Sequence, residues 1–321
     1  MVQLLLNRNA DTNARDGFGH TPLDAAAMVG NNEAVKLLLN KGVDINGPAK
    51  NIVTALYLAA THNHTAIVEM LLARGGFIDT TDTDFIPLHE AVMNSHRKAV
   101  ELLFDLGPKA DVIVKNGFTP LHESAAKGLG EAVIRFLLNQ GAPVNAPNNE
   151  GSTLLHIAAS GGFDIGVSQL LLEYGAEANL ADDNGRTPLH IAAEMANKAA
   201  LGTHDDILHA CSLTPGFYRA VMRLLLDHGA KINVADVNGR TPLHVAVEGA
   251  AFKTHDGEQE DNHATPWQKV ASESLNKEII QLLLDYGAQT DTTDNDGRTP
   301  LHLAVERANK AAFELLLYQE A

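Results

Sequence analysis

The sequence has little of three things that would place it in large classes of protein. It contains one cysteine, Cys211, among 321 residues, so no intrachain disulfide can form and a reducing compartment is expected. No apolar run approaches the roughly 20 residues that a membrane-spanning helix needs. Basic residues are also scarce: 24 Lys and Arg stand against 40 Asp and Glu, which gives a formal net charge of −16. We therefore expect an intracellular protein, cytoplasmic or nuclear, that does not insert into a membrane. Because phosphate contacts need a basic surface, we also expect no nucleic-acid partner.

The common catalytic signatures are missing as well. The sequence has no Gly-x-x-x-x-Gly-Lys-Ser/Thr phosphate loop, no Gly-x-Ser-x-Gly, no His-Glu-x-x-His and no paired-cysteine metal spacing. We predict that the chain is not an enzyme and that it carries no cofactor and no metal.

The sequence does contain a repeat. The tetrapeptide Thr-Pro-Leu-His, or a variant of it, recurs with its first position at residues 21, 54, 86, 119, 153, 187, 241 and 299. The first five intervals are 32 to 34 residues long, and the last two are 54 and 58. Each copy continues through small residues to a Leu-rich segment and a glycine, as in "AVMRLLLDHGAKIN". In this register the sequence resembles the ankyrin repeat family, and the resemblance covers the whole chain apart from two insertions.

The residue types of one unit predict its local structure. Thr187 suits a helix N-cap, and Pro188 suits the first helical position, where a missing N–H costs nothing. A second helix over "VMRLLL" should end at Gly229, which favours a left-handed cap. The segment that follows contains the tight-turn pair Asn238-Gly239 and is expected to form a projecting finger. Because one unit cannot bury its own apolar faces, we expect an all-α solenoid of stacked helix-turn-helix units with β-turn fingers.

We expect one ankyrin-repeat domain over residues 1–321. It would comprise a leading half-repeat at 1–20 and eight repeats at 21–321, with insertions at about 194–217 and 248–275. The insertions should replace the turn between the two helices of the sixth and seventh units. Helices should start again after Thr214 and Thr265, each of which precedes a proline.

A histidine that returns in a fixed context invites a catalytic interpretation. However, six copies, one per unit, lack the uniqueness of a catalytic site. Each lies three residues after the threonine, from where its side chain can reach back to the helix start as in a capping box. Asp24 could serve the same end in the first full unit. We therefore predict structural helix-start roles for Thr119, His122, Thr153, His156, Thr187, His190, Thr241, His244, Thr299 and His302.

The insertions hold the densest group of metal-ligand residue types. His204, Asp205 and Asp206 fit the His-x-Asp part of a two-histidine, one-carboxylate iron site, with His209 and Cys211 nearby. Short motifs of this kind arise often by chance, so a solvated polar loop is the simpler interpretation. A metal site in the insertions is kept as an alternative.

The residue before each threonine is expected at the exposed base of a finger. Along the chain this column changes from apolar and aromatic residues to arginines. Aromatic and arginine side chains are enriched at the energetic centres of protein interfaces. We predict a partner-binding surface formed by Val53, Phe85, Phe118, Arg186, Arg240 and Arg298. The alternative is that Gly-Arg-Thr is only a sequence that suits the finger backbone and that the phenylalanines pack between units.

The resemblance implies a non-catalytic module that binds another protein through a concave groove of fingers and first helices. The acidic composition and the apolar half of the column suggest a partner with a basic and apolar surface. The alternative function is a regulatory or targeting array of a larger enzyme whose catalytic domain lies outside this chain.

Overall fold

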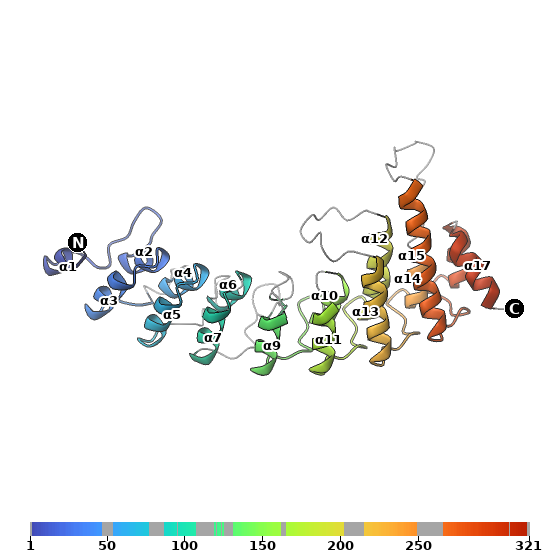
Figure 1. Cartoon of the computed structure of the whole chain (residues 1–321), viewed down its shortest axis with the longest axis horizontal. Coiled ribbons are helices and arrows are strands. Elements are labelled where there is room, and N and C mark those ends of the chain that lie inside the picture. The colour runs from blue at the N-terminus through green and yellow to red at the C-terminus, as the bar shows by residue number, and fades with distance from the viewer. Residues whose placement is uncertain are drawn as a thin grey trace. The chain divides into compact units, whose positions relative to one another are not determined.

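The protein is built from short helices that follow one another along the chain (Figure 1). The computed structural model describes residues 2–46, 54–76, 87–94, 96–106, 119, 121–122, 124, 131–161, 165–201, 215–248, 266–307 and 309–319. Over these residues the secondary structure is helical and contains no strand. The all-α prediction is therefore confirmed.

The chain divides into two compact units, Met1–Pro143 and Val144–Ala321. In the first unit, α2 packs on α4 and α4 on α6, while α3 packs on α5 and α5 on α7. The single helix α1 packs on the second helix α3. The helices of this unit are α1 (Val2–Asn7), α2 (Pro22–Met28), α3 (Asn32–Asn40), α4 (Ala55–Thr61), α5 (Thr65–Leu72), α6 (Pro87–Met93), α7 (Arg97–Leu106) and α9 (Glu131–Asn139).

The second unit repeats the same scheme. The first helices α10, α12, α14 and α16 pack in series, and the second helices α11, α13, α15 and α17 form a parallel series. The helices are α10 (Leu154–Ala159), α11 (Ile165–Glu173), α12 (Pro188–Leu201), α13 (Pro215–Asp227), α14 (Pro242–Glu248), α15 (Pro266–Asp285), α16 (Pro300–Glu306) and α17 (Lys310–Gln319).

Small and branched apolar residues form the core between these helices. Leu189, Ala192 and Ala193 of α12 are fully buried, as are Leu243 and Val247 of α14. Alanine at these positions lets neighbouring first helices approach closely, and the leucine fills the space toward the second helix. The stacked arrangement thus buries faces that no single unit could cover.

Local chemistry fixes the ends of the helices. Proline is the first residue of α12, α13, α14, α15 and α16, where its missing N–H leaves no hydrogen bond unmade. The second helix α13 is followed by Gly229 at φ 83°, the left-handed conformation that terminates a helix. Asn9 adopts φ 59° after α1, in the place that glycine takes elsewhere.

The two insertions change the length of helices in the second unit. Residues 194–201, which the sequence placed within the first insertion, continue α12 to a length of 14 residues. Helices start again at Pro215 and Pro266, and α15 runs for 20 residues. Residues 202–214 and 249–265, which contain the metal-ligand residue types of both insertions, lie outside the described residues.

Within the described ranges, no group of three or more His, Cys, Asp and Glu side chains is arranged to hold a metal. In the same ranges, no helix is long and apolar enough to cross a membrane.

Candidate functional site

Each described histidine of the repeat reaches back to the start of its own helix. In all five copies the ring Nδ1 accepts from the threonine backbone N–H at 3.1–3.3 Å. The same Nδ1 lies 2.8–2.9 Å from the threonine Oγ1. The pairs are Thr119–His122, Thr153–His156, Thr187–His190, Thr241–His244 and Thr299–His302. In the first full unit, Asp24 takes over, and its carboxylate accepts from both the backbone N–H and the hydroxyl of Thr21.

The other ring nitrogen links one unit to the next, which the sequence did not reveal. Nε2 of His156, His190 and His244 donates to the backbone carbonyl of Arg186, Arg240 and Arg298, respectively, at 3.0–3.1 Å. A carbonyl oxygen can only accept, so the proton of the neutral ring sits on Nε2 and Nδ1 is the acceptor. One ring therefore fixes a helix start and the base of the following finger.

These imidazoles are held in the neutral form. Burial lowers the pKa of His156, His190 and His244, and the hydrogen bond to the arginine carbonyl opposes that effect without cancelling it. A proton on Nδ1 would abolish its role as an acceptor for the threonine N–H. The ring thus works as a structural acceptor and donor at neutral pH.

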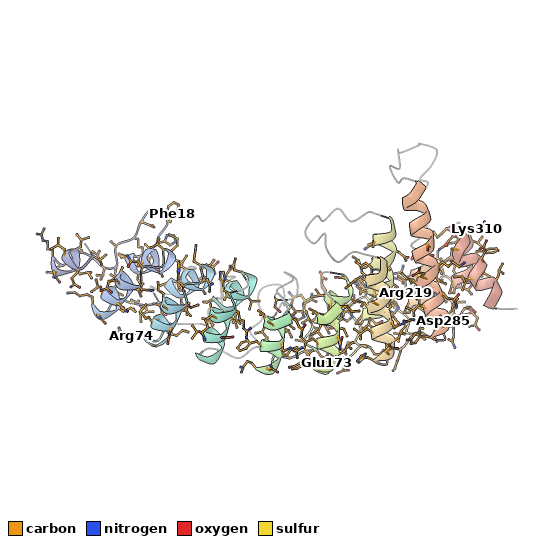
Figure 2. The ribbon with its side chains drawn as sticks, viewed as in Figure 1. Phe18, Arg74, Glu173, Arg219, Asp285 and Lys310 are labelled. Carbon is orange, nitrogen blue, oxygen red and sulfur yellow. The ribbon has the colours of Figure 1, made fainter. Side chains whose placement is uncertain are left out.

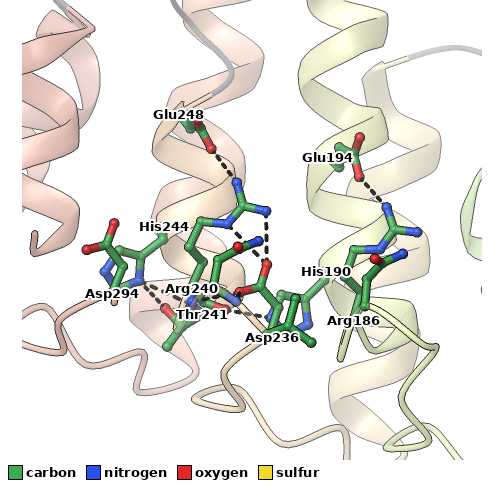
Figure 3. Close-up of polar contacts among 12 residues, drawn as sticks. Arg186, His190, Glu194, Asp236, Arg240, Thr241, His244, Glu248 and Asp294 are labelled. Atoms are coloured by element: carbon green, nitrogen blue, oxygen red, sulfur yellow. Dashed lines mark hydrogen bonds and ion pairs between the residues drawn. The ribbon is translucent and has the colours of Figure 1, made fainter. Parts of the chain in front are cut away.

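Each arginine of the predicted column contacts an aspartate of its finger and a glutamate of the first helix, and Figure 3 shows this for Arg240, between Asp236 and Glu248. Nε and Nη2 of Arg240 donate to Asp236 Oδ2 at 3.1 and 2.9 Å, and Nη1 donates to Glu248 Oε2 at 2.9 Å. Arg186 repeats this arrangement with Asp182 and Glu194. Arg298 contacts Asp294 in the same way, but it also pairs with Asp296 Oδ2 at 2.8 Å, and Glu306 Oε2 lies 3.7 Å away. We call each such set a finger triad: one finger aspartate, one arginine and one glutamate of the first helix.

The aspartate of each finger triad is locked by the finger backbone. Oδ1 of Asp236 accepts from the N–H groups of Asn238 and Arg240 at 2.8 and 2.9 Å, and its side chain is 1 % exposed. Burial alone raises the pKa of this carboxyl, but the hydrogen bonds from the backbone and guanidinium of Arg240 lower it overall. Those contacts also raise the pKa of Arg240 against the effect of burial. Both partners therefore stay charged, and the guanidinium has one fixed orientation.

An open groove lies beside two of the finger triads, between α12 and α14. Its volume is about 270 Å³. The guanidinium-bearing side chains of Arg186 and Arg240 are 30 % and 28 % exposed there. The lining residues are Arg186, His190, Glu194, Asn197, Lys198, Arg240, Val245 and Glu248. The structure thus brings two of the column's arginines to one groove, while Val53, Phe85 and Phe118 lie outside the described residues.

An exposed aromatic residue stands on the first finger, outside the predicted column. Phe18 lies three residues before Thr21 and is 89 % exposed, and its side chain projects from the ribbon (Figure 2). Val237, at the tip of a later finger, is 58 % exposed. The predicted column included only the residue directly before each threonine, so it left out fingertip residues such as Phe18 and Val237. An aromatic residue next to the turn glycine, as in "GFGHT", is the signal that could have revealed Phe18.

Fingers of neighbouring units also pair through their backbones. The N–H of Asp183 donates to Glu150, that of Val237 to Asn184 and that of Asn295 to Asn238, at 2.9–3.0 Å. The fingers of the second unit therefore form a continuous row rather than separate loops.

The family model for ankyrin repeats in three copies matches residues 1–84, 77–148, 124–203 and 248–321. Among curated proteins, the chain is 31 % identical over 316 residues to the transient receptor potential cation channel subfamily A member 1 of Homo sapiens, a match that covers 95 % of this chain and 24 % of that protein. It is 33 % identical over 138 residues to the probable 26S proteasome regulatory subunit p28 of Saccharomyces cerevisiae, covering 42 % of this chain and 60 % of that protein.

A third match is to the putative ankyrin repeat protein FPV031 of fowlpox virus, 35 % identical over 121 residues, or 36 % of either chain. The chain thus spans between about a quarter and three fifths of the length of these relatives. The matches of the family model together cover most of the sequence and leave out residues 204–247, which include α13. The chain belongs to the ankyrin repeat family.

Proposed function

We propose that the chain is a non-catalytic module that binds another protein on the face formed by its fingers and first helices. Repeat arrays of this kind present extended surfaces to their partners. The observation that carries the proposal is the set of finger triads, which hold part-exposed arginines in fixed orientations beside a groove. Arginine is among the residue types that dominate binding energy at protein interfaces.

The fixed geometry supports binding because little freedom remains to be lost. Ordering a free arginine side chain on binding costs about 0.5–1.5 kcal/mol. In the finger triads, the buried aspartates have already imposed that order. Partner contacts at Arg186, Arg240 and Arg298 therefore cost little reorganisation.

The partner we propose carries apolar surface, and its net charge is positive. We expect the exposed Phe18 of the first finger, and the predicted column residues Val53, Phe85 and Phe118, to contact that apolar surface. The net charge of −16 attracts a basic protein over long range. We place this interaction in the cytoplasm or nucleus, because the chain has a single cysteine.

A second candidate is a regulatory array that belongs to a larger protein. The alignment of 316 residues to a human cation channel favours it, since 95 % of this chain takes part in the match. The full open reading frame distinguishes the two candidates. A flanking channel or catalytic domain supports the regulatory array, and its absence supports a separate binding protein.

Affinity capture with the full chain as bait tests the proposal. The face variants are Phe18→Ala, Val237→Ala and Phe85→Ala/Phe118→Ala. The controls are Gln169→Ala and Glu173→Ala on the exposed side of the second helix α11. We expect at least one face variant to lose a partner that both controls keep, with circular dichroism verifying the fold. Partners that survive every face variant but are lost with the α11 variants would contradict the proposed surface.

A further inference from the structure

We propose that the groove between α12 and α14 binds an extended peptide segment that presents carboxylate side chains to Arg186 and Arg240, three residues apart. This inference rests on the protein-binding function proposed above, and it adds the chemistry of the bound segment. It follows from the orientation of the guanidinium groups, the charges within reach and the spacing of the units.

Each guanidinium still has donors for a ligand. Arginine carries five N–H groups, and the contacts of Arg240 with described residues use three of them. One N–H remains on each of Nη1 and Nη2, and the same count holds for Arg186. Two parallel N–H groups of a fixed guanidinium match the two oxygens of a carboxylate.

The charges that a ligand can reach favour an anion. Asp182 and Asp236 neutralise the arginines from behind, but their side chains are 1 % exposed and out of reach. Among the lining residues, Lys198 Nζ is paired with Glu194 Oε1 at 2.7 Å, so the two guanidinium groups of Arg186 and Arg240 are the donors that the groove offers to an anion. Charges elsewhere on this acidic chain act weakly here, because physiological salt screens interactions beyond about 8 Å.

The extended α12 makes this groove different from the next one along the row. Asn197 and Lys198 come from the turns by which α12 continues past Glu194. At the following junction, Arg307 Nη2 donates to Glu248 Oε1 at 2.9 Å. The insertion-bearing helix therefore supplies one wall of the groove.

The spacing of the units sets the spacing of the carboxylates. Packed helices lie about 8–10 Å apart, and an extended chain advances about 3.3 Å per residue. A segment that crosses from the Arg186 triad to the Arg240 triad therefore covers about three residues. Acidic residues at positions i and i+3 of the segment would meet the two arginines in turn.

Labelled synthetic peptides test the assignment with the full chain. One nine-residue Ser/Thr-rich peptide carries Glu at positions 3 and 6, a second carries Lys at those positions, and a third carries Glu at positions 3 and 4. In fluorescence anisotropy at about 150 mM salt, where charges elsewhere on the chain are screened, we expect the first to bind at least about tenfold more tightly than the other two. No binding of the first peptide, or equal binding of the lysine peptide, overturns the proposal.

Variants at Val245 test the sign of the charge that the groove accepts. Val245 lines the groove and lies outside the finger triads, so its substitution leaves those ion pairs in place. We expect Val245→Glu to weaken binding of the first peptide about tenfold and Val245→Lys to strengthen it. Gln169→Glu adds the same charge on α11 and should leave the affinity unchanged. Tighter binding to Val245→Glu would overturn the inference.

The same variant separates the failure of this inference from failure of the proposed function. If the Val245→Glu variant still captures a protein partner of the wild-type chain, the proposed binding function stands but the groove does not take part in it. A partner that Val245→Glu loses and Gln169→Glu keeps supports both.

Discussion

Single residues of the repeat make hydrogen bonds both within their own unit and to the neighbouring unit. His244 accepts from Thr241 at the start of its own helix and donates to the carbonyl of Arg298 in the next finger. Arg240, whose carbonyl receives the bond from His190, sends its side chain back across its own unit to Asp236 and Glu248. The opening hexapeptide of each unit therefore carries structural contacts at both its histidine and its arginine.

The buried histidines predict that acid destabilises the second unit. The pKa of His156, His190 and His244 lies below 6.5 in the folded chain and at about 6.5 when unfolded. Above pH 6.5 both states are neutral. As the pH falls below 6.5, the unfolded chain binds protons first, so stability falls until the folded pKa is passed. The loss is at most about 1.4 kcal/mol per pH unit for each histidine.

Urea unfolding at pH 7.5 and 5.5 measures this effect. The pKa values of Asp236 and Asp294 are lowered from 3.8, so these carboxyls do not titrate in this window. In the triple variant His156→Gln/His190→Gln/His244→Gln, glutamine can still cap the helix but does not titrate, and the pH dependence should flatten. An unchanged dependence in that variant would rule out the histidines as its source.

The finger triad predicts that removing its arginine lowers the free energy of unfolding, because a buried carboxylate then loses its partner. Arg240→Gln leaves the buried Asp236 carboxylate without its guanidinium, and we expect the free energy of unfolding to fall by about 1–3 kcal/mol. Asp236→Asn/Arg240→Gln should lose less, because no uncompensated charge stays buried. Denaturant titration of both variants checks this. Equal losses would show that the aspartate does not depend on the arginine.

At the scale of elements, the fingers and the second helices are fixed by contacts between units. Gly239 has φ 76°, and a side chain there would place Cβ 2.6 Å from Asn295 Oδ1 and 2.8 Å from Asn295 N. Between first and second helices, Asn276 of α15 donates to Asn197 Oδ1 of α12 and to the carbonyl of Ala246 in α14, and Asn309 donates to Asn276 Oδ1. These three buried asparagines connect α12, α15 and the start of α17.

Gly239 and Gly297 have nearly the same φ angle but different surroundings, so substituting each one separates the cost of backbone strain from that of finger packing. Gly297 has φ 77°, but nothing lies within 4 Å of the Cβ position. We expect Gly297→Ala to cost about 1–2 kcal/mol from the left-handed conformation alone. Gly239→Ala should cost about 1–3 kcal/mol more, because Asn295 must shift. Equal unfolding free energies for the two variants would mean that the fingers do not pack as described.

The hydrogen bonds among Asn197, Asn276 and Asn309, here called the asparagine ladder, predict that one substitution lowers the stability of three helices together. Asn276→Ala removes the central amide and leaves buried groups of Asn197 and Asn309 short of a partner, at a cost of about 1–3 kcal/mol for each such group. Hydrogen exchange should speed up in α12, α15 and α17 together. The exposed Ser274→Ala in α15 serves as the control. Faster exchange in α15 alone would show that the ladder does not couple the helices.

At the scale of the whole molecule, the periodic signals could be predicted and the contacts between units could not. Thr-Pro at helix starts, glycine after second helices and the leading half-unit depend on neighbouring residues, so the sequence displays them directly. The aspartate, arginine and glutamate of a finger triad also recur at fixed spacings, but their contact depends on how the finger folds back over the helix. The extension of α12 was hidden, because "EMANKAAL" is compatible with either a helix or a loop.

Some contacts between units involve a residue type that occurs in one unit alone, so no repeating pattern in the sequence predicts them. Tyr218 lies in the first turn of α13, at the position that Asn31 or His64 takes before the second helix of other units, and its hydroxyl donates to the carbonyl of Ser160 at 3.3 Å. The ring fits because Gly161 has no side chain: a Cβ there would lie within 3.0 Å of three ring and hydroxyl atoms. Such a pair spans 57 to 58 residues and becomes apparent only in three dimensions.

Hydrogen exchange of the full chain with and without its captured partner tests the central claim, that the fingers and first helices form the binding face. We predict slower exchange on binding in the fingers at 182–186, 236–240 and 294–298 and in α12 and α14, with α11 and α13 unchanged. Protection confined to α11, α13 and the other second helices would contradict the account.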